Sequence, residues 1–275
     1  MDDFKAMGLY NNVERIELDL AAAGISPGDS LGVDDLFAYD QYHYEGVAAV
    51  ASAANELGLG PDDRVLDIGS GLGGPARYLA DRFGCQVTAL EIQPDLHRVG
   101  LDLTERCGLS EQVRHIEGDI LEASVVGPHT AIVSMLCFLH IPDRDALFGR
   151  CAEVLSHGGS ILIDDYYARG DLTSDDKAAL ASEVQCRYLP SKAEYEADIR
   201  DGGFDVVEVA DRTSTWAAFV ADRSNKFAAS KSVLQDRYGS PTVDHLDRFY
   251  RTVAELFETQ RLGGARFRAT LTSAG

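Results

Sequence analysis

The stretch RVLDIGSGLGG (64–74) decides the fold of this 275-residue chain, because it joins an apolar strand directly to a glycine-rich turn. RVLDI (64–68) has the composition of a short buried strand, and an amphipathic helix pattern begins within GGPARYLADRF (73–83). Glycines in such a turn allow unusual backbone angles and let a ligand approach the main chain closely. The turn also aims backbone N–H groups and a helix start at whatever binds. We therefore expect a ligand site at the end of this strand.

The residues around this unit continue the same alternation of strands and helices. The expected strands cover 85–91, 113–120, 129–136 and 160–167, and the expected helices cover 73–83, 94–107 and 143–156. Such an alternation predicts a parallel sheet with helices on both faces. The ligand-binding edge is then the one where the carboxyl ends of the strands meet.

The C-terminal part of the chain departs from this alternation. A helix at 191–201 and a strand at 204–210 precede a long helical region, 213–261, which is interrupted at 238–241, and a last strand covers 265–272. We predict an α/β, Rossmann-like fold with a seven-stranded sheet, mostly parallel with the last strand antiparallel, and a helical lid inserted between the last two strands. The single domain 1–275 would divide into an N-terminal helical cap (1–58), a ligand-binding core (59–212), the helical lid (213–262) and a terminal return strand (263–275).

The charge of the chain excludes some partners. It has 45 Asp and Glu against 25 Lys and Arg, a formal net charge of −20, and we find no local basic stripe. Such a surface repels a phosphate backbone, so we expect no nucleic-acid partner. No segment is long and apolar enough to span a membrane, and the N-terminus lacks the apolar core of a secretory signal, so we expect a cytoplasmic protein. The five cysteines have no CxxC spacing, and we expect no metal site. A homo-oligomer is left open.

The glycine-rich turn by itself fits two cofactors. Gly69, Gly71 and Gly74 match the GxGxxG pattern of dinucleotide-binding proteins. Glu91, at the end of the second strand, lies about twenty residues further on, where an acid binds ribose hydroxyls. Both NAD and S-adenosylmethionine (SAM) carry such a ribose, so both remain candidates at this point.

Two further acids favour SAM. Asp67 lies near the carboxyl end of the first strand, where a carboxylate suits a cationic or amino-acid ligand and would repel a pyrophosphate. Asp119 follows the third strand, where it can accept a hydrogen bond from an adenine amino group. An alternative role for Asp119 is to cap a helix.

The run from Asp67 to Asp119 resembles the class I SAM-dependent methyltransferases. DIGSGLGG (67–74) is similar to their first motif, TALE (88–91) to their ribose-binding acid and EGDI (117–120) to their adenine-binding acid, within a match over roughly 45–272. The resemblance implies SAM as the cofactor. The predicted cofactor-binding residues are Asp67, Gly69, Ser70, Gly71, Gly73, Glu91, Ile92, Gln93, Asp119, Ile120 and Met135.

A second resemblance concerns the acceptor of the methyl group. SMLCFLHIPD (134–143) is similar to a region of small-molecule N-methyltransferases of the phosphoethanolamine and glycine/sarcosine types. In the phosphoethanolamine group, a His at this place works with an N-terminal Tyr. The resemblance therefore implies His140 as a catalytic base, and among Tyr39, Tyr42 and Tyr44 we favour Tyr39 as its partner. Alternatively, His140 caps a loop or packs beside Pro142.

The substrate-binding residues are expected on several elements. Trp216, Phe219 and Arg223 share one face of the predicted lid helix. Trp216 could contact a cation and Arg223 could hold a carboxylate or phosphate, or the same face could simply pack on the sheet. Tyr44 and Tyr166 complete the predicted substrate-binding set.

The function predicted from these residues is SAM-dependent methylation of a small-molecule acceptor, most specifically an amine nitrogen. Transfer to oxygen or sulfur of a small hydroxy or carboxylic acid, thioether or natural product stays open, because one fold serves all of these acceptors. Two other classes also remain, an NAD-dependent oxidoreductase and a non-catalytic SAM-binding protein. A step in the pH profile near a histidine pKa is expected if His140 is the base.

Overall fold

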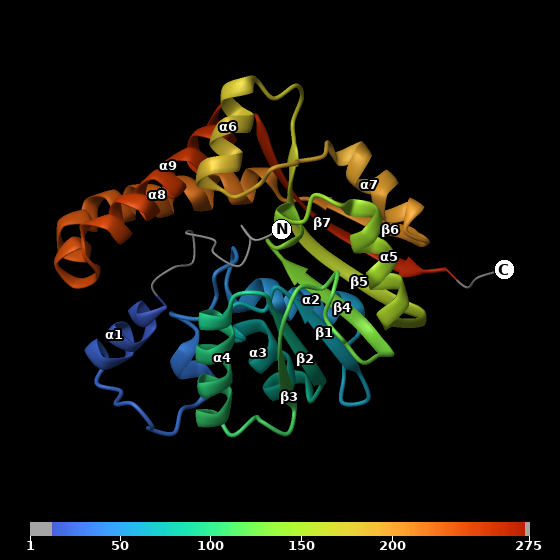
Figure 1. The fold of residues 1–275 in the computed structure, drawn as a ribbon, viewed down its shortest axis with the longest axis horizontal. Coiled ribbons are helices and arrows are strands. Elements are labelled where there is room, and N and C mark those ends of the chain that lie inside the picture. The colour runs from blue at the N-terminus through green and yellow to red at the C-terminus, as the bar shows by residue number, and fades with distance from the viewer. Residues whose placement is uncertain (1–12, 273–275) are drawn as a thin grey trace.

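The computed structural model describes residues 13–272, and its centre is one seven-stranded sheet (Figure 1). The strand order is β3-β2-β1-β4-β5-β7-β6, and β7 runs antiparallel to both of its neighbours. The strands are β1 (Arg64–Ile68), β2 (Gln86–Glu91), β3 (Val113–Glu117), β4 (His129–Met135), β5 (Leu155–Ala168), β6 (Phe204–Asp211) and β7 (Leu262–Leu271). The predicted fold class is confirmed, and the strand order reverses between β1 and β4, where ligands bind in such sheets.

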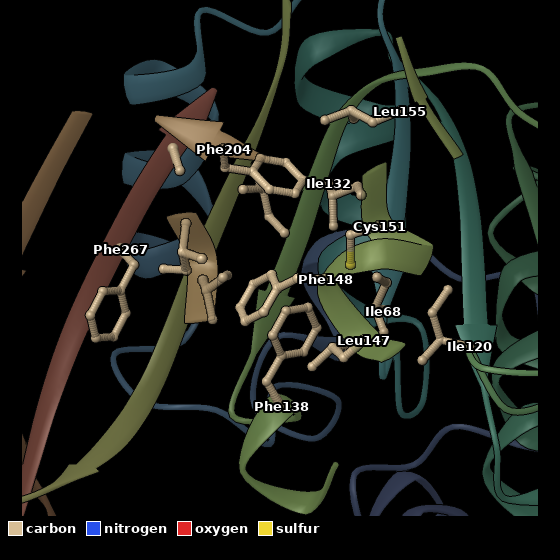
Figure 2. Packing of buried hydrophobic residues seen from close by; sticks show 14 of the residues in the cluster. Ile68, Ile120, Ile132, Phe138, Leu147, Phe148, Cys151, Leu155, Phe204 and Phe267 are labelled. Carbon is tan, nitrogen blue, oxygen red and sulfur yellow. The ribbon is translucent and has the colours of Figure 1, made fainter. Parts of the chain in front are cut away.

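Helices cover both faces of the sheet. On one face, α5 (Arg144–Val154) and α7 (Lys192–Asp201) pack over the strands through residues such as Phe148 and Tyr195, and Figure 2 shows Phe148 between the helix and the sheet. On the other face, α2 (Val47–Leu57) and α3 (Gly74–Phe83) pack through small and branched apolar side chains. Both faces of the sheet are therefore shielded from solvent, which explains the nearly continuous apolar character of β1 and β4.

A third layer covers the carboxyl ends of the strands. The helices α8 (Thr213–Tyr238) and α9 (Ser240–Glu258) connect β6 to β7 as a long hairpin that projects beyond the sheet (Figure 1). The hairpin packs on α6 (Ser174–Glu183), and its tip reaches α1 (Glu14–Ala22), where Arg237 pairs with Asp19 at 3.1 Å. The inserted helical pair was predicted. In the described part of the chain, none of the helices has the length and apolarity needed to cross a bilayer.

Some element boundaries differ from the predicted ones. β5 begins at Leu155 rather than 160, because its pairing with β4 shifts register between His129 and Ala131 and thereby accommodates 156–159. The helix α6 was not predicted, although Thr173 and Asp176 form a capping box at its start that the sequence pattern T-x-x-D carries. In the N-terminal region, α2 packs directly on the sheet rather than only closing the site.

The N-terminal segment is fastened to α3 by a buried ion pair. Arg77 on α3 donates to Asp40 at 2.9 Å, and neither side chain is accessible to solvent. Arg77 also donates to the carbonyl of Gly100 and the hydroxyl of Thr104, both on α4 (Pro94–Arg106). The contact requires a glycine at 74, because a Cβ there would lie 2.4 Å from the carbonyl oxygen of Asp40. One arginine thus joins three segments of the chain.

Replacing Arg77 by Met should destabilise the protein by about 3–5 kcal/mol, because it leaves the Asp40 carboxylate buried without its cation. Burial already raises the pKa of Asp40. In the variant that pKa rises further above its unfolded value, so the folded state binds the extra proton and stability falls as the pH rises. The loss, measured by urea unfolding, should therefore be larger at pH 8 than at pH 5.

A suitable control is Arg200→Met, which breaks an exposed pair with Glu196 one turn away on α7. That change should cost at most about 0.5 kcal/mol. A loss for Arg77→Met as small as the control's would show that the buried pair does not hold the N-terminal segment.

Candidate active site

Two adjoining cavities lie at the carboxyl ends of the strands. The first has a volume of about 310 Å³ and the second of about 200 Å³. Three residues, Tyr42, Leu136 and His140, line both cavities and so mark their junction. The first cavity lies at the ends of β1, β2 and β4, at the reversal of strand order, and the second lies under the α8–α9 hairpin.

The glycine-rich turn forms the floor of the first cavity. Gly69 has φ +78°, and a Cβ there would lie 2.3 Å from the Sγ of Cys137, so only glycine fits against the loop that follows β4. Ser70 and Gly71 line the cavity, and the Gly71 N–H donates to the Glu91 carboxylate at 2.8 Å. The turn is therefore held between the loop after β4 and the end of β2.

Three acidic side chains line the first cavity, and they differ in their hydrogen-bond partners. Glu91 accepts backbone hydrogen bonds from Gly71 and Gln93, each at 2.8 Å, and Asp119 accepts one from the Leu121 N–H at 3.0 Å. Asp67 differs, because its Oδ2 is buried and has no hydrogen-bond partner among the described residues. Burial, and then the charge of Glu91, raise the pKa of Asp67 to about 7. A buried carboxylate oxygen without a donor fits a ligand that brings a cationic amino group.

The predicted cofactor-binding residues gather around this cavity with one exception. The lining includes Asp67, Gly69, Ser70, Gly71, Glu91, Ile92, Gln93, Asp119, Ile120 and Met135. Gly73 is not in the lining. It precedes α3 with φ +77°, and a Cβ there would lie 2.8 Å from the ring of His115, so its position is explained by packing. Asp119 lines the cavity and also accepts a backbone hydrogen bond within the turn that follows β3, where no helix begins.

The second cavity collects most of the predicted substrate-binding residues and several that were not predicted. Tyr39, Tyr44, Tyr166 and Arg223 line it, together with the unpredicted Arg15 and Asp19 on α1 and Tyr250 on α9. Nothing local in the sequence identifies these three residues, because their helices meet only after folding. Of the three N-terminal tyrosines, only Tyr42 lines both cavities, as His140 does, whereas the favoured Tyr39 lines the second cavity alone.

Trp216 and Phe219 line neither cavity. Trp216 is 2% exposed and packs edge-on to Tyr44 with ring centroids 5.2 Å apart, and its indole N–H donates to Glu45 at 3.3 Å. Phe219 lies 5.1 Å from the same tyrosine ring. For these two residues the alternative prediction, that this helix face packs against the protein, is the one observed, and both pack against the Tyr44 ring.

Arg223 is the exception on that helix face. Its guanidinium donates to the Tyr250 hydroxyl at 3.2 Å and lies 4.7 Å from the centre of the same ring. Arg15 enters the cavity from α1, on a different element, and hydrogen-bonds to Tyr42. Two cationic side chains therefore line a small cavity that is otherwise rich in tyrosine hydroxyls.

His140 is neutral at physiological pH. Its Nδ1 lies 3.1 Å from the carbonyl oxygen of Gln185 and so donates to it, which leaves the lone pair of the neutral ring on Nε2. Burial lowers the pKa of His140 to about 4. A second histidine, His43, also lines the first cavity; its Nε2 is 3.0 Å from the Gly46 carbonyl oxygen, and burial lowers its pKa to about 4 as well. His140 is thus a weaker base than its predicted role assumed.

The chain matches known proteins in both sequence and fold. Residues 65–159 match the family model described as a methyltransferase domain. The chain is 28% identical over 156 residues to a sarcosine/dimethylglycine N-methyltransferase of Halorhodospira halochloris, covering 56% of each protein. It is 30% identical over 169 residues to phosphoethanolamine N-methyltransferase 3 of Arabidopsis thaliana, covering 61% of this chain and 34% of that protein. The chain thus spans less than two thirds of either relative.

A solved cyclopropane synthase from Mycobacterium tuberculosis shares the whole fold, with a TM-score of 0.79 at 17% identity and 98% of each chain covered. Residues 65–159 thus match a methyltransferase domain, and the chain has the Rossmann-like fold that the motifs indicated for class I SAM-dependent methyltransferases. Within that class, the two curated relatives are N-methyltransferases named for small molecules. The match decides against an NAD-dependent oxidoreductase.

Replacing Asp67 by Asn should weaken binding of S-adenosylhomocysteine at least tenfold, because the orphaned carboxylate oxygen loses its charge. In the unaltered protein, affinity should rise about tenfold per pH unit toward pH 7 and level off above it, since the ammonium of the ligand prefers the ionised carboxylate. Isothermal titration calorimetry between pH 5.5 and 8.5 measures both effects, and the Asp67→Asn variant should show no such dependence.

The matched control is Asp205→Asn, an exposed acid on the edge strand β6, which should leave affinity and pH dependence unchanged. A pH-independent affinity in the unaltered protein would argue that Asp67 does not meet the amino group.

Proposed function

We propose that this protein is a SAM-dependent methyltransferase that methylates the nitrogen of a small amine bearing an anionic group. The observation that carries the proposal is the pair of adjoining cavities that share Tyr42, Leu136 and His140. One cavity has the acids that suit SAM, and the other has arginines and tyrosines that suit a small polar acceptor. Two ligands in these cavities meet at the junction, as direct transfer between them requires.

The first cavity has a suitable group for each part of the cofactor. Asp67 would accept from its amino group, Glu91 from its ribose hydroxyls and Asp119 from its adenine amino group. When bound, SAM supplies a methyl group activated by a positively charged sulfur. Met135 and Leu136 give that end of the cavity an apolar lining, which would favour transfer over hydrolysis.

The second cavity favours an acceptor with an anionic end. Arg15 and Arg223 enter it from separate helices, and arginine is well suited to carboxylate or phosphate groups. The names of the two relatives, sarcosine/dimethylglycine and phosphoethanolamine N-methyltransferase, each describe an amine with such a group. A cavity of about 200 Å³ with this polar lining favours a compact acceptor over the long acyl chain of a lipid.

The state of His140 assigns it an orienting role. Proton transfer from an ammonium group with a pKa of about 9–10 to an imidazole with a pKa of about 4 costs on the order of 7 kcal/mol. The acceptor therefore enters as the free amine, and Nε2 of His140 accepts a hydrogen bond from its N–H. Tyr42, whose pKa burial raises, stays a neutral hydroxyl at the same junction. Together they direct the nitrogen lone pair toward the first cavity.

Titration calorimetry followed by an acceptor panel tests the proposal. S-adenosylhomocysteine and SAM should bind and NAD⁺ should not. Glycine, sarcosine, dimethylglycine and phosphoethanolamine should then be assayed for methylation beside small hydroxy acids and thioethers. Transfer only to oxygen or sulfur acceptors would overturn the amine assignment. Binding of the cofactor with no transfer across the panel would favour a non-catalytic SAM-binding protein.

Replacing Arg223 by Met should raise the KM of the methylated acceptor by about 10–100-fold, because a charged hydrogen bond to its anionic group is lost. The KM of an analogue whose anionic group is replaced by an amide or hydroxyl should not change. Steady-state kinetics measure both, and Arg251→Met, on the exposed side of α9, is the control. Equal effects on both acceptors would show that Arg223 does not bind the anion.

Replacing His140 by Ala should lower kcat on the order of 10²-fold, because the nitrogen loses its hydrogen-bonded orientation. The profile of kcat/KM against pH should rise toward the ammonium pKa of the acceptor in both proteins, since a group with a pKa of about 4 does not titrate between pH 5.5 and 8. A limb with a midpoint near 6.5 that disappears in the variant would instead make His140 a proton acceptor.

A further inference from the structure

The short turn that carries His140 has little stability of its own. Phe138–His140 is a single turn of 3-10 helix, with backbone bonds from His140 to Cys137 at 3.0 Å and from Ile141 to Phe138 at 2.9 Å. So short a turn has little intrinsic stability. It also follows Leu136, which has φ +54°, a conformation that disfavours a residue with a side chain. Neighbouring groups must therefore fix the turn.

A buried carboxylate lies against the turn from the side of the sheet. Asp165 on β5 is 0% exposed, and its oxygens accept from the Tyr166 N–H at 2.8 Å and from the Tyr195 hydroxyl at 2.9 Å. The backbone N–H of Leu139, in the middle of the turn, lies close enough to the same carboxylate to lower its pKa. Asp165 lines neither cavity and is closed off from solvent.

A buried guanidinium binds the backbone carbonyl of Phe138, the residue before Leu139 in the same turn. Arg144, the first residue of α5, donates to the Phe138 carbonyl at 2.9 Å. Its guanidinium lies 4.2 Å from the centre of the Tyr195 ring and contacts Asp198 at 3.4 Å. Arg144 thus binds the C=O of residue 138, and Asp165 lies near the N–H of residue 139, so side chains of opposite charge lie at the two ends of one peptide group.

The contribution of these buried charges to the stability of the fold does not by itself explain why they are there. A buried pair of opposite charges is often no more stabilising than apolar side chains of similar volume, because desolvation opposes the attraction. Burial raises the pKa of Asp165 to about 7 even though the charge of Arg144 opposes the rise. What the pair provides, and apolar residues cannot, is two directional bonds to one backbone turn.

We propose that Asp165 and Arg144 are positioning residues, which fix the Phe138–His140 turn and thereby hold the His140 imidazole at the junction of the two cavities. Their role in methyl transfer depends on the function proposed above, whereas their effect on the His140 ring does not. Because neither residue lines a cavity, they act through the turn and not by touching a ligand.

The pKa of His140, measured by NMR of its ring protons, tests this role without any need for turnover. In the unaltered protein the ring should not titrate between pH 5.5 and 8, because it is buried. In Asp165→Asn, the asparagine presents an N–H₂ group to donors, so the turn loosens, water reaches the ring, and the pKa should rise by at least one unit toward the ordinary value of about 6.5. Tyr42 shares the junction but remains neutral over this range, whereas Asp165, whose pKa burial raises to about 7, titrates within it and can shift the ring signals without protonating the ring.

Two further variants keep the test decisive if Asp165→Asn fails to fold. Arg144→Met should raise the same pKa by a similar amount, and Tyr195→Phe, which removes one hydroxyl donor, by less. The control is Tyr167→Phe on the same strand, which removes a hydroxyl bonded to Asp211 at 3.0 Å and should leave His140 unchanged. S-adenosylhomocysteine affinity should stay within about twofold in all of them.

A His140 ring that stays neutral in folded Asp165→Asn and Arg144→Met, as in the unaltered protein, would overturn the positioning role. A general loss of stability without local loosening gives that result, because it leaves the folded environment of the ring intact. Absence of methyl transfer in the unaltered protein would refute the proposed function, but it would not affect the proposal that Asp165 and Arg144 position the turn.

Discussion

The buried contact between Arg77 and Asp40 is the constraint on which the active-site arrangement depends. It fastens the N-terminal segment, with its tyrosines, to the helix that begins at the glycine-rich turn. Because Gly74 has no side chain, the Asp40 backbone can lie directly against that helix. The segment then closes both cavities from one side and places Tyr42 at their junction.

The junction between the cavities works through neutral groups. Burial keeps His140 unprotonated and Tyr42 protonated, so neither adds a charge where the methyl group would pass. The charges lie further away, with acids around the first cavity and arginines in the second. Such a division binds two charged ligands at their distant ends and leaves an apolar, water-poor space between them, which suits a transfer in which position matters more than acid–base chemistry.

The cofactor half of the site could be predicted residue by residue, and the acceptor half only by its elements. Asp67, Glu91 and Asp119 each follow a strand, and parallel strands bring their carboxyl ends together, so order along the chain fixed their proximity. Trp216 and Arg223 share a helix face, yet one is buried behind Tyr44 and the other enters the cavity. The periodicity of a sequence predicts which residues share a helix face, but it does not predict which of them will line a cavity.

The sequence by itself predicted the fold class, SAM as the cofactor and the edge of the sheet where the cavities lie, because these depend on short-range patterns: apolar strands, a glycine turn and acids at strand ends. Only the tertiary structure decided that Tyr42 lines both cavities with His140, that Arg15 and Tyr250 enter the second cavity, and that Asp165 is buried near a backbone turn instead of exposed to solvent. These depend on contacts between segments that lie far apart in the chain. Burial also set the protonation of His140, since desolvation exists only once the surrounding residues have packed.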